Sequence, residues 1–325
     1  MAKYLIFQKT RNLSAALVTI TIAISLTFSL FIEFESSVWQ IWLAVIALAV
    51  GIPHGALDHI VTVPSMRPAR LAIFVSGYLA ITGLVILVIL RWPVQGFIFV
   101  VLMSAIHFGM GDASFTIQSN ETGSTRSSPW WIYALPAGTL PVIVPLTNSE
   151  SSDALTLVNP TLLNWHSGFD EILFWLTIAI GIVAATYLWI RKQHVDARDL
   201  LILGSLAVLT PPLVAFSAYF GLWHALRHTA RLSLEIDKPR ALAMTGNWQS
   251  TLWRTTLPGV PALIGTMIFA GVITAIGGWG FSQYFWIALV VVWALTVPHM
   301  ALTWRLDRKV LLNNRSKVSG TFLTD

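Results

Sequence analysis

The chain has 325 residues, of which 55% are hydrophobic and 11% are charged, whereas soluble domains carry about 25% charged residues. Apolar runs of about 20 residues, each long enough to cross a hydrocarbon core of about 30 Å, recur from end to end. This composition excludes a soluble globular protein and predicts an all-α, polytopic transmembrane bundle that forms a single domain over residues 1–325. The absence of cysteine excludes disulfides, thiolate metal sites and cysteine nucleophiles. The net charge of +5 is better explained by membrane topology than by binding of nucleic acid.

We predict about ten membrane-spanning helices, and a count of eight or nine also fits the pattern. The first apolar run begins near Leu13 and is too long for the core of a signal peptide, so we assign it as the first span. Proline interrupts two regions, 130–147 and the stretch around Pro211-Pro212, where kinked or broken helices are expected. The predicted spans are 13–33, 38–59, 71–91, 93–111, 130–147, 171–190, 199–216, 217–234, 257–277 and 284–304.

Basic residues predict the orientation of these spans. If the N-terminus is cytoplasmic and ten spans alternate, all of the 20 Lys and Arg residues except Arg91 fall on the inner side, as the positive-inside rule requires. Both termini are then cytoplasmic, with residues 1–12 as the N-terminal segment and residues 305–325 as the tail. The polar stretch from Asp112 to Pro129 is expected to form a flexible inner loop, and residues 148–170 an outer loop. The expected location is the inner cell membrane.

The histidines form the most informative pattern in the chain. His166 and His194 fall in predicted loops and are expected to be solvated surface residues. The other six lie toward the inner ends of the second, fourth, eighth and tenth spans, all of which run from outside to inside. Because ionisable residues within spans are costly and usually face the bundle interior with a partner, we expect a shared site near the cytoplasmic leaflet. These six are His54, His59, His107, His224, His228 and His299.

The segment WHALRH (223–228) carries two histidines four residues apart. On a helix, His224 and His228 lie about 40° apart around the axis and one turn above each other. Both imidazoles can therefore reach one metal ion from the same face. Arg227 lies between them and is expected to extend its charge to the cytoplasmic interface.

The segment HGALDH (54–59) offers two further candidates. His54 and Asp58 are four residues apart and share a helical face, whereas His59 lies about 140° around the helix from His54. Both histidines could bind one ion only if the helix is distorted, which the proline and glycine flanking His54 make feasible. Asp58 and Asp112 are the natural acceptors for the second N–H of metal-bound imidazoles, although each could instead pair with a nearby arginine.

An all-imidazole site without cysteine suits zinc, copper, iron or nickel, and the residues alone do not choose among these metals. The setting favours iron that activates dioxygen, because oxygen and apolar substrates both concentrate in lipid, whereas a water-activating zinc site needs water. Several large side chains near the histidines are lipid anchors, core residues or pocket lining: Phe108, Tyr219, Phe220, Trp223, Met300 and Trp304.

The ordered motifs HGALDH (54–59), HFGMGD (107–112), WHALRH (223–228) and PHM (298–300) resemble those of the Brp/Blh family of membrane carotenoid dioxygenases. The resemblance extends from residue 51 to residue 300. It implies a carotenoid-cleaving enzyme, a β-carotene 15,15′-dioxygenase, that depends on non-haem iron(II) and dioxygen. The implied products are two molecules of all-trans retinal, which in this family commonly supply the chromophore of a microbial rhodopsin.

Carried over position by position, the resemblance implies an Fe(2+) site of four histidines. His59 is the alternative to the first of them, and His299 is either a neighbour of the ligands or substrate, or a fifth ligand. Asp58 and Asp112 would support the ligands. The implied ligands, which are also the implied catalytic residues, are His54, His107, His224 and His228.

The resemblance implies β-carotene and dioxygen as substrates, membrane lipid as the surroundings and no nucleic-acid partner. The carotenoid is expected to enter laterally from lipid into an apolar tunnel between helices. Three other interpretations are weighed. A membrane non-haem oxygenase or hydroxylase could act on another lipid, although a di-iron enzyme needs an adjacent histidine pair that the sequence lacks. A transporter should place ionisable groups across the full bilayer depth, and a haem-binding bundle could use the same histidines.

Overall fold

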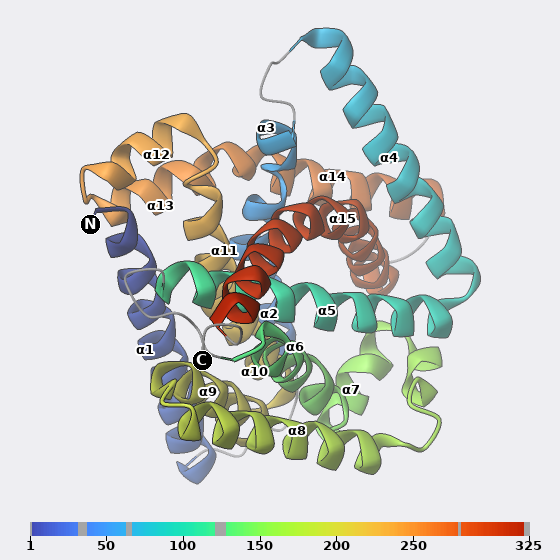
Figure 1. The fold of residues 1–325 in the computed structure, drawn as a ribbon. Coiled ribbons are helices and arrows are strands. Elements are labelled where there is room, and N and C mark those ends of the chain that lie inside the picture. Colours follow the sequence, from blue (N-terminus) through green and yellow to red (C-terminus); the bar gives the residue numbers. More distant parts are fainter. Residues whose placement is uncertain (1, 32–37, 63–66, 121–127, 279–280, 322–325) are drawn as a thin grey trace.

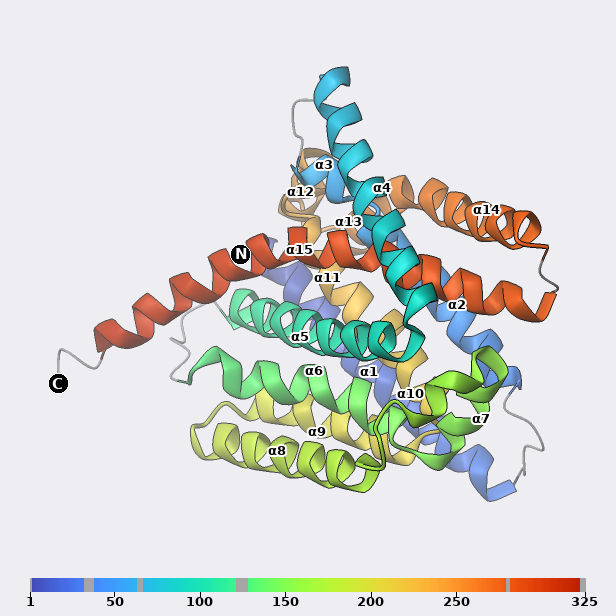
Figure 2. The ribbon, with the colours of Figure 1, turned by 90° about the vertical axis from the view of Figure 1, so that its right-hand side faces the viewer.

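The computed structural model describes residues 2–31, 38–62, 67–120, 128–278 and 281–321. These residues form helices joined by turns, with no strand among them, and this confirms the predicted all-α class. Helices α15 (Phe281–Thr321), α5 (Pro93–Asn120), α6 (Trp130–Leu146) and α8 (Asp170–Ile190) lie one above another in Figure 2, with α9 (His194–Leu209) beside α8. Helices α1 (Ala2–Phe31), α2 (Val38–Gly55) and α10 (Pro212–Ser217) cross this stack (Figures 1 and 2). The remaining elements are α3 (Asp58–Thr62), α4 (Pro68–Arg91), α7 (Ser149–Val158), η1 (Pro160–Asn164), η2 (Ala218–His224), α11 (Ala225–Leu232), α12 (Asp237–Met244), α13 (Trp248–Thr256), η3 (Leu257–Gly259) and α14 (Val260–Ile276).

Among the described residues, six helices are long and apolar enough to cross a membrane, and the bent pair α6–α7 would make a seventh. The outer helices α4, α8 and α14 expose large apolar side chains such as Leu87, Val183 and Ile276, as expected of helices that face lipid. These features support a polytopic helical membrane protein, while the count of about ten stays a prediction. The six helices are Tyr4–Phe31, Pro68–Arg91, Pro93–Asn120, Asp170–Ile190, Trp248–Ile276 and Gln283–Leu312.

The division between the predicted spans 199–216 and 217–234 is wrong. Helix α9 ends at Leu209, and the extended Thr210, with a ψ of 153°, separates it from Pro211. A residue before proline is sterically driven to this extended region. The chain then continues from α10 through η2 into α11 without a gap.

The predicted inner loop is also shorter than expected. Helix α5 continues to Asn120, so Asp112 lies inside a helix, and residues 121–127 lie outside the described residues. The predicted outer loop 148–170 contains the short helices α7 and η1.

Helices α5 and α6 touch at two glycines. A methyl group built on Gly138 would lie 1.9 Å from the carbonyl oxygen of Ala105, and one on Gly109 would lie 2.2 Å from that of Ala134. Small residues permit such close approach between membrane helices. Because His107 precedes Gly109 by two residues, this contact fixes the position of His107 within the bundle.

The element η2 is a π-helical turn, and its last residue is His224. A regular helix was predicted over this segment. Short π-helical segments inside longer helices are rare and occur frequently at functional sites. Because a π-helical turn contains more residues than an α-helical turn, the residues of α11 are rotated around the helix axis relative to those of α10.

Candidate metal centre and adjoining cavity

Four imidazole rings meet in the interior of the bundle. His107 comes from α5, His299 from α15, His224 from the end of η2 and His228 from α11, and all four side chains are buried. The centroid of the His107 ring lies 5.1 Å from that of His224, 6.1 Å from that of His228 and 5.3 Å from that of His299. The His228 ring lies 5.7 Å from His224 and 5.8 Å from His299. The structure therefore brings together three of the four implied ligands, with His299 at the same spacing.

These spacings fit imidazoles that share one metal ion. With metal–nitrogen bonds of about 2.1 Å, the ring centres of two such ligands lie roughly 4.5–6.5 Å apart. Imidazole is also a donor that iron, zinc, copper and nickel accept. Among the described residues, no three His, Cys, Asp or Glu side chains have their donor atoms gathered as tightly as around a bound ion. The fit of a metal to this cluster therefore rests on the type of donor and on the spacing of the rings.

The side chain of His54, the fourth implied ligand, lies outside the described residues, although its backbone belongs to α2. Helix α2 ends at the next residue, Gly55, and α3 begins at Asp58. The prediction that His54 and Asp58 share one helical face is therefore wrong, because the chain leaves the helix between them. The helix distortion considered around His54 is present as this break.

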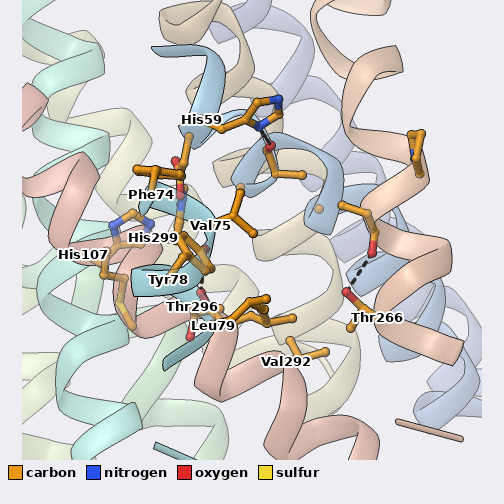
Figure 3. Close-up of a pocket in the computed structure, with 18 of the residues that line it drawn as sticks. His59, Phe74, Val75, Tyr78, Leu79, His107, Thr266, Val292, Thr296 and His299 are labelled. Carbon is orange, nitrogen blue, oxygen red and sulfur yellow. Dashed lines mark hydrogen bonds and ion pairs between the residues drawn. The ribbon is translucent and has the colours of Figure 1, made fainter. Parts of the chain in front are cut away.

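The alternative ligand His59 lies apart from the cluster. Its Nδ1 is 2.9 Å from the carbonyl oxygen of Ala56, one turn earlier, and Figure 3 shows its ring away from those of His107 and His299. The two histidines expected at the surface are outside the cluster as well: His194 is exposed and His166 is partly exposed.

Oxygen atoms lie beside the Nδ1 atoms of two clustered rings. Both carboxylate oxygens of Asp58 are 3.0 Å from Nδ1 of His299, and Oγ1 of Thr303 is 3.2 Å from Nδ1 of His107. A neutral imidazole that donates from Nδ1 keeps Nε2 as the nitrogen able to bind a metal. Asp58 was expected to support a metal ligand, whereas Thr303 was missed because a threonine in an apolar helix gives no distinctive signal.

Asp112 lies beside another ring of the cluster, that of His224. Its Oδ2 accepts hydrogen bonds from Nε1 of Trp223, at 3.0 Å, and from the hydroxyl of Tyr219, at 3.2 Å. Its Oδ1 is 3.6 Å from Nδ1 of His224. The two donors hold the carboxylate beside the ring of His224.

The prediction that Arg227 extends to the cytoplasmic interface is wrong. Its side chain is 1% exposed, and the guanidinium lies 3.4 Å above the ring of Trp223. Nε donates to Oγ of Ser14, at 2.9 Å, and Nη2 donates to Oδ2 of Asp199, at 3.1 Å. The guanidinium of Arg227 is thus bound by a buried carboxylate of α9 instead of being exposed to solvent.

A second arginine completes this arrangement. Arg11 of α1 donates from Nε to Asp199, at 2.9 Å, and from Nη2 to Asp196, at 2.5 Å. Two arginines and two aspartates from α1, α9 and α11 therefore form a charge-balanced cluster, which we call the buried charge cluster. This cluster was not predicted, although an aspartate at the start of a predicted span, Asp199, was a signal. Its members are Arg11, Asp196, Asp199 and Arg227.

A cavity of about 500 Å³ adjoins the imidazole cluster. His107 and His299 are part of its wall, and residues from α2, α4, α14 and α15 form most of the rest (Figure 3). The wall is mainly apolar and includes Phe74 and Leu79 of α4 and Val292 of α15. Such a cavity suits an apolar ligand better than a polar one.

A model of the family described as beta-carotene 15,15'-dioxygenase matches residues 45–307. The chain belongs to this family. The match includes all four histidine motifs, and the resemblance found from those motifs is confirmed.

Two curated relatives carry related names. The beta-carotene 15,15'-dioxygenase of an uncultured marine bacterium, 66A03, is 30% identical over 196 residues, which cover 58% of this chain and 67% of the relative. The probable beta-carotene 15,15'-dioxygenase Blh of Halobacterium salinarum is 25% identical over 297 residues, which cover 81% and 82%. No solved structure matches the chain.

In this member of the β-carotene 15,15′-dioxygenase family, the large side chains near the histidines lie in three different environments: the cavity wall, the core and the surface. Phe108, Phe220 and Met300 line the cavity, whereas Tyr219 and Trp223 are buried beside Asp112. Trp304 is exposed. Pocket lining therefore applies to three of these residues and core to two, while a lipid anchor at Trp304 stays a prediction.

Proposed function

We propose that this protein cleaves β-carotene at its 15,15′ double bond and uses iron(II) and dioxygen to do so. The observation that carries the proposal is the double position of His107 and His299, which belong both to the imidazole cluster and to the wall of an apolar cavity. Family membership supports the substrate and the bond that is cleaved. The reaction is balanced without a further reductant, because the two oxygen atoms of O2 become the aldehyde oxygens of two molecules of all-trans retinal.

The proposed iron site consists of His54, His107, His224 and His228, and iron bound there supplies the activation of dioxygen. The protein contributes orientation, because Thr303 beside His107 and Asp112 beside His224 restrict their rings. Ligand orientation of this kind raises metal affinity.

The cavity is proposed to hold the central part of the polyene. Its apolar wall excludes water, and the faces of Phe108 and Phe220 offer flat contacts to a conjugated chain. Helix α4, which exposes apolar side chains outward and lines the cavity inward, is the proposed boundary with lipid. A membrane-dissolved carotenoid would reach the cavity from this side.

We also propose that the protein spans the inner cell membrane about ten times with both termini in the cytoplasm, and that retinal passes to a microbial rhodopsin. The distribution of basic residues supports this orientation. Three of the arginines used in that argument, Arg11, Arg227 and Arg231, are buried with partners inside the protein and carry no topological information. The bias of the other basic residues is unchanged.

Product analysis tests the proposed reaction. Purified protein in air should convert each β-carotene to two molecules of retinal with uptake of one O2, because both oxygens enter the products. Removal of iron with a chelator should abolish conversion, and Fe(2+), but not Zn(2+), should restore it. Products of unequal length, or conversion at the same rate without oxygen, would contradict the proposal.

Enlarging one residue of the cavity wall should weaken substrate binding without removing the metal. Val292 lines the cavity, and Val292→Phe should raise the KM for β-carotene about tenfold, since an overpacked site loses about 1–3 kcal/mol. Val208→Phe on the exposed surface of α9 is the matched control. Kinetics and iron content of both variants check the prediction, and an unchanged KM for Val292→Phe would place the substrate elsewhere.

A further inference from the structure

His299 belongs to the imidazole cluster and also lines the cavity. Its ring centroid is 5.3 Å from His107 and 5.8 Å from His228. The implied ligands His107, His224 and His228 lie 5.1–6.1 Å from one another. The spacing of His299 from two of these rings is therefore the same as the spacing among the residues to which the family resemblance assigns the metal.

Asp58 fixes the orientation of this ring. Both of its carboxylate oxygens are 3.0 Å from Nδ1 of His299, and both side chains are buried, with 7% and 6% exposed. A carboxylate only accepts hydrogen bonds, so Nδ1 carries the proton and Nε2 is the nitrogen with a lone pair in the neutral ring. The backbone of Gly55 lies beside the same edge, because a methyl group built there would be 3.5 Å from Nδ1. A metal could therefore be reached only through Nε2.

Tyr78 of α4 shares the cavity wall with Asp58 and His299. Its hydroxyl donates a hydrogen bond to the carbonyl oxygen of Leu295 on α15, at 2.9 Å. Figure 3 shows Tyr78 beside His299 in this wall. The hydrogen bond of Tyr78 therefore joins α4 to the helix that carries His299.

We propose that His299 is a further metal ligand, on the cavity side of the cluster, and that Asp58 is a positioning residue that holds its Nε2 toward the ion. This inference rests on the proposed iron site. Aspartates that accept the second N–H of a metal-bound imidazole fix the tautomer and increase ligand basicity. The competing explanation is a buried pair that only joins α3 to α15, and it predicts lower stability with unchanged metal affinity.

Cobalt binding separates the two explanations without using activity. Apo protein in detergent is titrated with Co(2+), and its affinity and visible absorption spectrum are recorded together with the thermal unfolding temperature. His299→Gln should change the spectrum and weaken binding by at least tenfold. Asp58→Asn should weaken binding about 10–100-fold, and Asp58→Glu should restore part of it. Tyr78→Phe should have the smallest effect.

Two matched controls are available at the surface. His194→Gln and Asp237→Asn make the same chemical changes at exposed positions, and both should leave Co(2+) affinity and spectrum unchanged. If His299→Gln and Asp58→Asn lower only the unfolding temperature, the proposed role of both residues is overturned.

The outcome for His224→Ala distinguishes this inference from the proposed function. If His224→Ala loses Co(2+) while His299→Gln retains both wild-type affinity and spectrum, only the present inference fails. If the wild-type protein itself binds no Co(2+) or Fe(2+), the iron site and this inference fail together.

Discussion

Replacing His224 with alanine is expected to abolish retinal formation and to remove iron from the purified protein. His224 is 1% exposed, and its ring is 5.1 Å from that of His107 and 5.7 Å from that of His228. An alanine leaves a cavity where a nitrogen donor stood. Because loss of a residue that only supports a ligand costs about 10–100-fold, loss of the ligand itself should lower kcat/KM by more than roughly 100-fold.

The measurement combines retinal yield, iron content and thermal unfolding of the same sample. His194→Ala, at an exposed position of α9, is the matched control and should behave as the wild type. A folded His224→Ala protein with full iron content and normal retinal yield would show that the assignment of this ligand is wrong.

The convergence of the histidines could be predicted because the relevant information is local. Helical spacing places His224 near His228, and the position of each histidine within its span places His107 and His299 at one depth. The family motifs cover the same residues. The π-helical turn that ends at His224 was not predictable in this way, because no residue between 218 and 224 distinguishes it from a regular helix.

The role of Arg227 depends on residues that are distant in sequence, and this explains why it was mispredicted. One partner, Ser14, is 213 residues away and the other, Asp199, is 28 residues away. Long, flexible arginine side chains at helix ends commonly reach the interface, so the local sequence favoured that expectation. Only the packing of α1 against α9 and α11 brings a carboxylate within reach.

The buried charge cluster holds the segment that carries two of the proposed iron ligands. Arg227 lies between His224 and His228 in the sequence, and its pairing with Asp199 joins this segment to α9. Asp199 also pairs with Arg11 of α1. A single carboxylate, with a side chain that is fully buried, thus binds two buried arginines and joins α9 to α1 and α11.

Asp199→Ala should therefore be the most destabilising single change outside the iron site. It would leave Arg227 buried without a carboxylate partner and Arg11 with Asp196 alone, and breaking a buried ion pair in this way costs about 3–5 kcal/mol. An effect of this size should lower the thermal unfolding temperature by roughly 10 °C. Iron should be lost at a correspondingly lower temperature, because the segment that carries His224 and His228 loses its link to α9.

Arg198→Ala is a closely matched control. Nη2 of Arg198 lies 2.9 Å from the same carboxylate, but its side chain is 44% exposed, and ion pairs open to solvent contribute only about 0–1 kcal/mol. Thermal scanning with simultaneous detection of released iron should therefore separate the two variants by several degrees. Equal unfolding temperatures for Asp199→Ala and Arg198→Ala would mean that water or another group replaces the lost carboxylate, and that α1, α9 and α11 are held together by apolar packing alone.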